Sequence, residues 1–404
     1  MIPKLNPSIS LADVRQIILP GKSLERFEEA FAQAAGSKYA ISFPYGRTAM
    51  ICLFEALGLS DAEIICPSYT CVVVPHAIRY SGNKPVFVDC EQGSYLMDLD
   101  LAAEAVTSRT RAIIVTSFFG EPVSAAAVAR FRQRHPEVIV LQDCAHSFFC
   151  GGDHLPIHQN GKASIFGLNI SKLITSVFGG MVTTDDGDLN ALIRAKRSAR
   201  LHKAGLFKSI SRRIYLATSA CALSTAGFWA THRLIDWGLL ARFVKYYDET
   251  VIDMPNDYLS DMTSFEAAIG LHQLRRFAKI SDHRTQIARK YLEQLSGIPN
   301  LTLPRDCDGR TWSHFTIKAS SEKLAGEIVA SALRQGIELG RMLEYFIPDM
   351  PIYRSEVHLD RGVARGHVGK TFNLPLHCNV NPDVVDRISN IIAAKSAEEP
   401  LQIL

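Results

Sequence analysis

Short apolar segments alternate with helical stretches along the first half of the chain, and this alternation restricts the folds that it can adopt. Each segment is bounded by Gly, Pro or polar residues, as strands buried on both faces are. The predicted strands are Glu63–Cys66, Pro85–Val88, Arg111–Ser117 and Val138–Leu141. Helical patterns fall between them at Val72–Tyr80, Leu99–Val106 and Val123–Arg134. Such β-α-β alternation predicts a mainly parallel sheet with helices on both faces.

The chain has 404 residues, enough for two domains, and its pattern changes near residue 250. After the alternation ends, residues 201–250 form an atypical helical insertion. Patterns such as helical Ser264–Phe277 and strand-like Trp312–Lys318 then predict a different, α+β unit. We therefore expect a large α/β domain over residues 1–250, which includes the insertion, and a small α+β domain over residues 251–404.

In the insertion, a stretch rich in basic residues is followed by an uncharged one. Ile214–Ala230 carries no charge in 17 residues. This stretch is too short, and too rich in Ser, Thr, Ala and Gly, to predict a membrane span. Two interpretations remain open. The insertion forms helices that pack over the site or the dimer contact, or it makes a peripheral contact with a membrane surface through residues 201–250.

Charge and cysteine content argue against other classes of protein. The net charge is +3, from 44 Lys and Arg against 41 Asp and Glu, so we expect no nucleic-acid partner. The first residues, MIPKLNPSISLADV, lack the layout of a signal peptide. Nine cysteines, an odd number without a CxxC pair, indicate the reduced thiols of a cytoplasmic protein.

Two charged residues follow buried apolar segments: Asp143 after Val138–Leu141, and Lys172 after Ile165–Ile170. Charges at the carboxyl ends of parallel strands face a crevice at one edge of the sheet. An aspartate 29 residues before a lysine fits pyridoxal phosphate. The lysine amine would form a Schiff base with the aldehyde, and the carboxylate would keep the pyridine nitrogen protonated. By itself, the pair fits an ordinary ion pair in an α/β sheet better than it fits a cofactor site.

The turn SFPYGRTAM joins a predicted strand to a predicted helix. Gly46 lets the backbone approach a ligand, and the amides of Arg47, Thr48 and Ala49 lie at the helix N-terminus. Such a turn suits a phosphate group, with the Thr48 hydroxyl and the Arg47 guanidinium as further donors. A plain capped helix is the alternative.

A series of short motifs resembles the DegT/DnrJ/EryC1/StrS family. In order, they are YGRTAM, CPSYTC, PVFVDCEQGSYLMD, FFGEP, QDCAHS, FGLNISK, GGMVTT, MTSFEAAIGLHQL and LPLHCNVNPDVVDRI. The resemblance implies a pyridoxal-phosphate-dependent aminotransferase acting on a nucleotide-linked keto sugar. It also implies the aspartate-aminotransferase-like fold (fold type I), in which a mainly parallel sheet of the seven-stranded type lies between helices, with a smaller α+β domain. A homodimer and glutamate as the amino donor belong to the same expectation.

The resemblance also implies roles for single residues. Lys172 falls at the Schiff-base lysine, and Asp143 at the partner of the pyridinium nitrogen. His146 occupies the position that touches the ring near its hydroxyl, and the turn Gly46–Thr48 is where the family holds the phosphate. Once the amino donor displaces it, the freed lysine amine can move a proton between the substrate carbon and the cofactor.

The sequence departs from the family pattern at three places. Gly167 stands where relatives often place a serine on the phosphate, and Asn169 or Ser171 would compensate for it. Cys71 replaces the aromatic residue that stacks on the ring, with Tyr69 nearby as a substitute. The asparagine–arginine segment that reaches the neighbouring subunit's site reads YLSDMT here, with Asp261.

We therefore expect a cytoplasmic, homodimeric aminotransferase in the biosynthesis of an amino sugar for a polysaccharide or natural product. The departures keep two alternatives open. One is a pyridoxal-phosphate enzyme of another type, either a sugar dehydratase or an aminotransferase for a non-sugar ketone. The other is a non-catalytic, membrane-associated relative. Retention of Lys172, where dehydratase relatives have histidine, favours transamination.

Other polar residues have weaker claims. A group that could attract zinc has the spacing of no standard finger, so we expect no metal site; it comprises His146, Cys150, Asp153, His154 and His158. Three residues of the C-terminal half could meet anionic groups of a substrate, and they are His314, Arg341 and His377.

Overall fold

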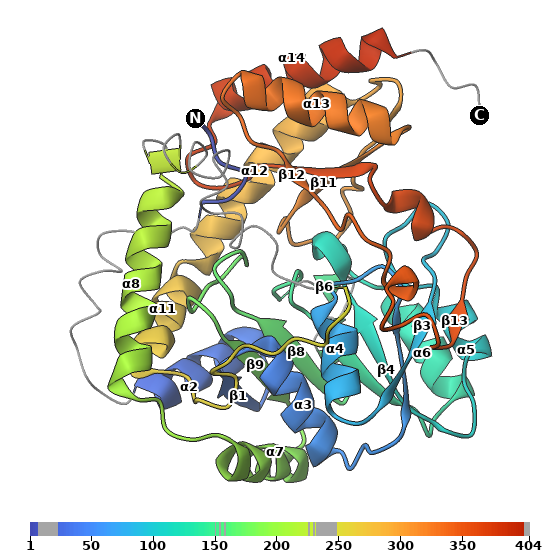
Figure 1. Cartoon of the computed structure of the whole chain (residues 1–404), viewed down its shortest axis with the longest axis vertical. Helices are drawn as coiled ribbons and strands as arrows, with labels where there is room; N and C mark the ends of the chain where they lie inside the picture. Colours follow the sequence, from blue (N-terminus) through green and yellow to red (C-terminus); the bar gives the residue numbers. More distant parts are fainter. Residues whose placement is uncertain are drawn as a thin grey trace.

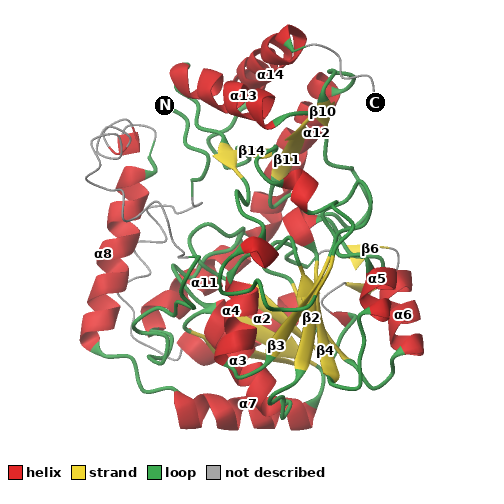
Figure 2. Ribbon diagram, turned by 45° about the vertical axis from the view of Figure 1, so that its right-hand side comes forward, coloured by secondary structure: helices red, strands yellow, loops and turns green. Residues whose placement is uncertain are grey.

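The computed structural model of the chain describes residues 1–6, 23–149, 151–152, 155–156, 159–224, 227–228, 231 and 249–399. A large sheet flanked by helices forms its lower part in Figure 1, and a small sheet covered by helices lies above it. Figure 2 shows the strands of the large sheet enclosed between helices.

The large sheet has eight strands in the order β1-β9-β8-β5-β4-β2-β3-β13. Their bounds are β1 Tyr39–Phe43, β2 Glu63–Pro67, β3 Lys84–Val88, β4 Thr110–Thr116, β5 Ile139–Asp143, β8 Ala163–Gly167, β9 Gly180–Thr184 and β13 His358–Leu359. Within this sheet β9 runs antiparallel to both neighbours, and the other pairs are parallel. The predicted mainly parallel, seven-stranded sheet is thus confirmed, with short β13 added at its edge.

Helices cover both faces of this sheet because its strands are apolar on both faces. In β4, for example, Ile113 and Val115 join one core, whereas Ala112 and Ile114 join the other. The first face packs against α2 Ser23–Ala35, α5 Leu99–Glu104, α6 Ala125–Arg134 and α11 Ser264–Arg275. The second face packs against α3 Gly46–Ala56, α4 Val73–Tyr80 and α7 Gly187–Arg200.

The small sheet is antiparallel throughout its described strands, in the order β10-β11-β14-β12. It comprises β10 Leu301–Thr302, β11 Phe315–Ala319, β12 Gly340–Arg341 and β14 Thr371–Leu374. Its helices are α12 Phe277–Leu295, α13 Glu322–Arg334 and α14 Pro382–Glu398. The remaining short elements are the hairpin β6 Gly151–Gly152 and β7 Leu155–Pro156, and the 3-10 turns Phe118–Gly120, Ile347–Asp349 and Arg365–His367.

The core of the large sheet extends past the predicted domain boundary at residue 250. Ala267 and Leu274 of α11, and Ile280 in the first turn of α12, belong to it, and the core of the small sheet begins at Ile287. α11 lies directly on α2, where a Cβ on Gly270 would come within 2.4 Å of the Phe27 ring. The boundary at residue 250 stays a prediction, and we propose from the packing that the change of core falls within α12.

The described part of the insertion is mainly the helix α8 Leu206–Ala222, which stands beside α11 in Figure 1. Lys208 and Arg212 are buried on its inner side, whereas Leu206 and Phe207 are 84% and 86% exposed. Two basic side chains of the insertion therefore face the protein interior. No helix of the described residues is long and apolar enough to cross a membrane. Most of residues 225–248 lie outside the described part of the chain.

Candidate active site

The candidate site lies at the edge of the large sheet where β4, β5 and β8 end. Asp143 is the last residue of β5 and pairs with Thr116, the last residue of β4. Lys172 lies in a short turn after Gly167, the last residue of β8. The N–H of Lys172 closes this turn by donating to the Asn169 carbonyl oxygen at 3.0 Å. The parallel order of the strands thus brings the predicted aspartate and lysine to one edge.

The Lys172 side chain passes over Gly167. A Cβ at Gly167 would lie 3.4 Å from the Cε of Lys172 and 3.4 Å from the Cβ of Ala145. Burial lowers the pKa of Lys172 below its ordinary value, and the nearby Cys71 and Asp143 oppose this effect. An amine with a lowered pKa is more often deprotonated at neutral pH, as a nucleophile or a proton acceptor must be.

Asp143 is 4% exposed and has few groups to balance its charge. Its Oδ1 accepts a hydrogen bond from the N–H of Ala145 at 3.0 Å. Burial raises the pKa of Asp143, while the Ala145 N–H and the Lys172 amine act in the opposite direction. A buried carboxylate of this kind is stabilised by a cationic partner with an N–H donor.

Two histidines and two phenylalanines form an aromatic cluster beside Lys172. The rings of His146 and His314 have centroids 4.5 Å apart, and Phe118 stacks on His146 at 4.9 Å. The Nδ1 of His146 accepts the backbone N–H of Phe119 at 3.4 Å, so its proton belongs on Nε2.

Both imidazoles are neutral at pH 7. Burial lowers the pKa of His146 well below its usual range, and Lys172 and His314 add to this shift. Burial, Lys172 and two arginines lower the pKa of His314 to about 3. His314 immediately precedes β11, so the small sheet contributes directly to the site. The sequence offered His314 as a partner for anionic groups, but a neutral imidazole can act only through hydrogen bonds.

The turn Phe118–Gly120 is fixed by the same C-terminal segment. Phe119 has the left-handed backbone angles φ 53° and ψ 21°, which are rare for an aromatic residue. Gly120 has φ 81°, and a Cβ there would lie 1.6 Å from the carbonyl oxygen of Thr311. Thr311 also donates its N–H to the Gly120 carbonyl oxygen at 2.9 Å. This contact explains why the motif FFGEP needs glycine.

The N-terminus of α3 meets the end of β8 and the start of β9 at the same edge. A Cβ at Gly46 would lie 3.7 Å from the Cα of Gly167, and one at Gly180 only 2.7 Å from the Cα of Gly46. Tyr45, the N-cap residue, makes no side-chain cap hydrogen bond to the helix. Backbone amides in the first turn of a helix have no partner within the helix, so the first turn of α3, Gly46–Thr48, suits an anion at this edge. We call these residues the α3 cradle.

The side chains of the cradle turn toward residues 253–258. An Nη1 atom of Arg47 donates to the Asp253 carbonyl oxygen at 2.6 Å, and the Thr48 hydroxyl donates to the Tyr258 carbonyl oxygen at 3.0 Å. The contribution of these side chains to phosphate binding stays a prediction, and backbone amides are the donors that the geometry favours.

The residues at the three departures from the family pattern, and their predicted substitutes, have partners within the protein. The Oδ1 atom of Asn169 accepts the N–H and the hydroxyl of Ser171, at 3.0 and 2.6 Å. Tyr69 is buried against Tyr95, with ring centroids 5.9 Å apart. Asp261 accepts two hydrogen bonds from an Nη2 atom of Arg197, at 3.0 and 2.9 Å.

Two of the C-terminal candidates also have structural partners. His377 is buried with its Nε2 2.9 Å from the carbonyl oxygen of Pro3. Arg341 donates to the Gly369 carbonyl oxygen at 3.0 Å and pairs with Glu344 at 2.8 Å. Of the three C-terminal candidates, His314 is thus the one that the described contacts bring to the site.

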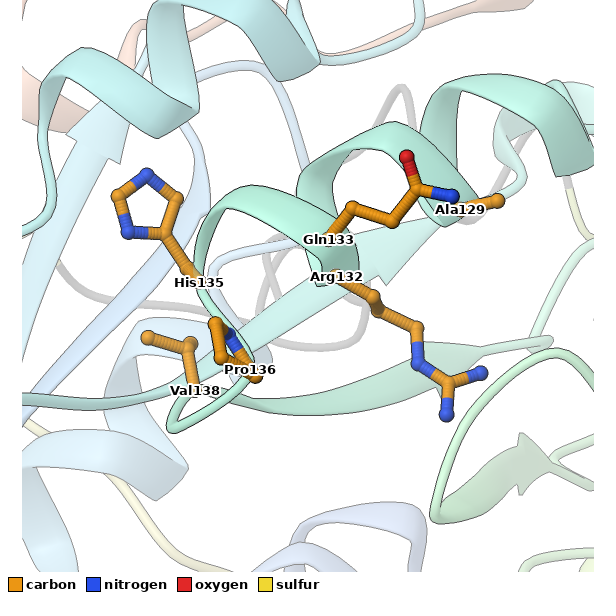
Figure 3. A pocket seen from close by; sticks show the side chains of 6 residues that line it. All are labelled: Ala129, Arg132, Gln133, His135, Pro136 and Val138. Carbon is orange, nitrogen blue, oxygen red and sulfur yellow. The ribbon is translucent and has the colours of Figure 1, made fainter.

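Metal and cavity observations do not point to a second centre. Among the described residues, no group of three or more His, Cys, Asp or Glu could hold a metal ion. Of the five residues of the zinc alternative, only His146 lies within the described part of the chain. A cavity of about 330 Å³ lies between α6 and the residues just before β5 (Figure 3). Asp143 ends β5, so the cavity lies at the opposite edge of the large sheet. It is lined by Ala129, Arg132, Gln133, His135, Pro136 and Val138.

Comparisons with known proteins agree with this arrangement. A model of the DegT/DnrJ/EryC1/StrS aminotransferase family matches residues 8–393. The spore coat polysaccharide biosynthesis protein SpsC of Bacillus subtilis is 28% identical over 379 residues, which cover 91% of this chain and 88% of SpsC. A UDP-4-amino-4-deoxy-L-arabinose–oxoglutarate aminotransferase of Shewanella sediminis is 26% identical over 310 residues, which cover 74% of this chain and 71% of that enzyme.

Solved structures share the fold. DesI, crystallised with its TDP-sugar product, superposes with a TM-score of 0.76 at 22% identity, covering 97% of this chain and 92% of DesI. Helicobacter pylori PseC, an aminotransferase involved in the biosynthesis of pseudoaminic acid, gives a TM-score of 0.77 at 19% identity, covering 98% of this chain and 99% of PseC. These similarities confirm the predicted fold class.

Proposed function

Because the chain belongs to the DegT/DnrJ/EryC1/StrS aminotransferase family, we propose that it transfers an amino group from glutamate to the keto group of a nucleotide-linked sugar, with pyridoxal phosphate as cofactor. The observation that carries the proposal is the pair of buried Asp143 and half-buried Lys172, which lie together at the carboxyl edge of a parallel sheet. The printed names of SpsC and the Shewanella enzyme support amino-sugar and polysaccharide biosynthesis as the setting.

The residues of the site fit pyridoxal phosphate. Asp143 is buried with a negative charge that the Ala145 N–H and the Lys172 amine balance only in part, and a protonated ring nitrogen would complete the balance. The buried hydroxyls of Ser68 and Thr70, at the carboxyl end of β2, have no hydrogen-bond partner among the described residues. Such groups are costly unless a ligand or water satisfies them. The α3 cradle offers backbone amides to a phosphate, close to Gly167.

Each residue has a distinct part in the proposed chemistry. When bound, the cofactor supplies an electron-withdrawing ring that stabilises negative charge on the substrate carbon. Asp143 would hold the ring nitrogen, and the Nε2–H of His146 would donate to the ring hydroxyl. The Nζ of Lys172, with its lowered pKa, would accept a proton from one carbon and return it to another. Phe118 and Phe119 would keep bulk water from this step.

His314 extends the sequence-based site. Its ring lies 4.5 Å from that of His146, and the nearby Lys172 amine adds to the burial that lowers the pKa of His314. We propose that the neutral imidazole of His314 orients the bound substrate through a hydrogen bond. We retain the homodimer and the cytoplasmic location as parts of the same proposal, and gel filtration and cell fractionation test them.

An absorbance titration tests the function. Purified protein is mixed with pyridoxal phosphate and then with glutamate, beside Lys172→Ala as the matched variant. We expect a visible band that glutamate bleaches in the wild-type protein and that Lys172→Ala does not form. Bleaching by glutamate followed by recovery with a nucleotide-linked 4-keto sugar would support the whole proposal. A band that glutamate leaves unchanged would favour the alternative enzyme types, and no cofactor binding at all would contradict the proposal.

A further inference from the structure

Arg212 of the insertion helix α8 contacts Tyr45, the N-cap residue directly before α3. The Nε of Arg212 donates to Glu266 Oε1 at 3.0 Å, and its Nη2 donates to the Tyr45 hydroxyl at 2.7 Å and to Asp257 Oδ2 at 2.5 Å. The guanidinium also covers the ring of Phe178 at 4.2 Å. Arg212 is 8% exposed and Glu266 is 0% exposed, so their ion pair is shielded from solvent, whereas Asp257 is half-buried.

Tyr45 transmits this contact to the α3 cradle. It is the N-cap residue of α3, directly before Gly46, and its backbone forms a bridge with Gly179. Its hydroxyl donates to Asp257 Oδ1 at 2.5 Å. Because both Arg212 and Asp257 hold this hydroxyl, the Tyr45 side chain, and with it the start of α3, has little freedom to move.

Residues 253–258 hold the next two residues of the cradle. Arg47 bonds to the Asp253 carbonyl oxygen and Thr48 to the Tyr258 carbonyl oxygen. Lys208, one turn before Arg212 on α8, donates to the Ser260 carbonyl oxygen at 2.6 Å. The first turn of α3 is therefore attached to a segment that α8 fixes through two buried cations.

We propose that Arg212 is a positioning residue for the phosphate-binding end of α3, acting through Tyr45 and Asp257. The insertion thus serves the cofactor site from outside it, by keeping the amides of Gly46–Thr48 in the orientation that an anion requires. This inference rests on the proposed use of pyridoxal phosphate. It predicts that weakening the contact reduces affinity for the phosphate group specifically.

The test compares two ligands that differ only in the phosphate. Dissociation constants of pyridoxal phosphate and of pyridoxal are measured by absorbance titration for the wild-type protein, Arg212→Met and Tyr45→Phe. Tyr45→Phe removes one hydroxyl and leaves the ion pair of Arg212 with Glu266, so it also serves if Arg212→Met does not fold. Arg213→Met is the matched control, since Arg213 lies on the same helix but contacts Ser209 and Phe265.

We expect Tyr45→Phe to raise the Kd of pyridoxal phosphate about tenfold and Arg212→Met to raise it further, with the Kd of pyridoxal changed less than about twofold. Arg213→Met should leave both constants unchanged. If a variant weakens both ligands equally, the ratio of the Kd of pyridoxal to that of pyridoxal phosphate stays that of the wild type. This result would overturn the inference while the proposed function stands. A wild-type protein that binds no pyridoxal phosphate would overturn both.

Discussion

Because Asp143 is buried, we expect Asp143→Asn to have opposite effects on the stability of the cofactor-free and the cofactor-bound protein. In the cofactor-free protein the folded-state pKa of Asp143 is raised by burial. A carboxyl with a raised pKa stabilises the fold below its unfolded-state pKa, and this contribution is lost as pH rises through the folded-state pKa. At pH 7 the ionised group therefore costs stability.

The size of the change in unfolding free energy follows from the contacts that Asp143 makes in the cofactor-free protein. Desolvation of an ion costs several kcal/mol, and a hydrogen bond to a charged group returns about 1.5–3 kcal/mol. Asp143 has the Ala145 N–H as such a donor, and Lys172 as a partly exposed counter-charge. Asn keeps the acceptor for Ala145 and removes the charge. We therefore expect Asp143→Asn to raise the free energy of unfolding of the cofactor-free protein by about 1–2 kcal/mol.

With pyridoxal phosphate bound, we expect the wild-type protein to be more stable than Asp143→Asn. At a concentration one hundred times its Kd, a ligand stabilises the wild-type fold by about 2.7 kcal/mol. Asp143→Asn lacks the carboxylate that balances the ring nitrogen, so we expect it to lose most of that gain together with transamination. Urea unfolding at pH 7, with and without the cofactor, measures both quantities.

Asp282→Asn on the exposed side of α12 is the control, and we expect a change within about 0.5 kcal/mol. A cofactor-free Asp143→Asn protein less stable than the wild type by 1 kcal/mol or more would refute the reasoning. Asp143 would then gain more from Lys172 than it loses by burial.

Three further predictions concern other contacts. Gly270→Ala gains about 1 kcal/mol of helix propensity but places a Cβ 2.4 Å from the Phe27 ring, so we expect a net loss of about 1–3 kcal/mol in urea unfolding; a stabilised variant would contradict the close packing of α2 and α11. Because the pKa of His314 is about 3 when folded and near 6.5 when unfolded, unfolding takes up a proton in acid and stability falls as pH drops below about 6. His314→Asn should reduce this slope by up to about 1.4 kcal/mol per pH unit, and an unchanged slope would show that the ring titrates normally. Gly167→Ser restores a hydroxyl that relatives often have, and it needs only a small shift of Lys172; we expect the Kd of pyridoxal phosphate to fall by up to about tenfold, whereas a rise would mean that the side chain blocks the lysine.

The sequence predicted the large sheet well because each strand is a short apolar run that periodicity detects. Helix α4, Val73–Tyr80, and helix α6, Ala125–Arg134, also lie within the predicted helical stretches Val72–Tyr80 and Val123–Arg134. The two-residue strand β13 is too short to leave such a signal. Periodicity also indicates which face of α11 is buried but not which sheet it faces, so the pattern placed α11 in the second domain although its core residues join the first.

The candidate site was only partly predictable for a related reason. Asp143, Lys172 and His146 could be placed because strand ends and motif order locate them along one sheet. His314 reaches the same cluster through the fold of a distant segment, which no local pattern encodes. Arg212 and Lys208 look like surface or membrane-facing charges in the sequence, because their carboxylate partners Asp257 and Glu266 lie about fifty residues further along the chain.

The edge strand β13 has a consequence for the order in which the protein folds during its synthesis. Residues 39–184 supply seven strands early, but β3 remains the open edge of the sheet until His358 and Leu359 pair with Phe87 and Val88. An exposed strand edge can pair with another chain. We infer that a polypeptide stalled before residue 358 keeps this edge uncovered on the ribosome, and that chaperone contacts during translation should concentrate on β3 until the last tenth of the chain has emerged.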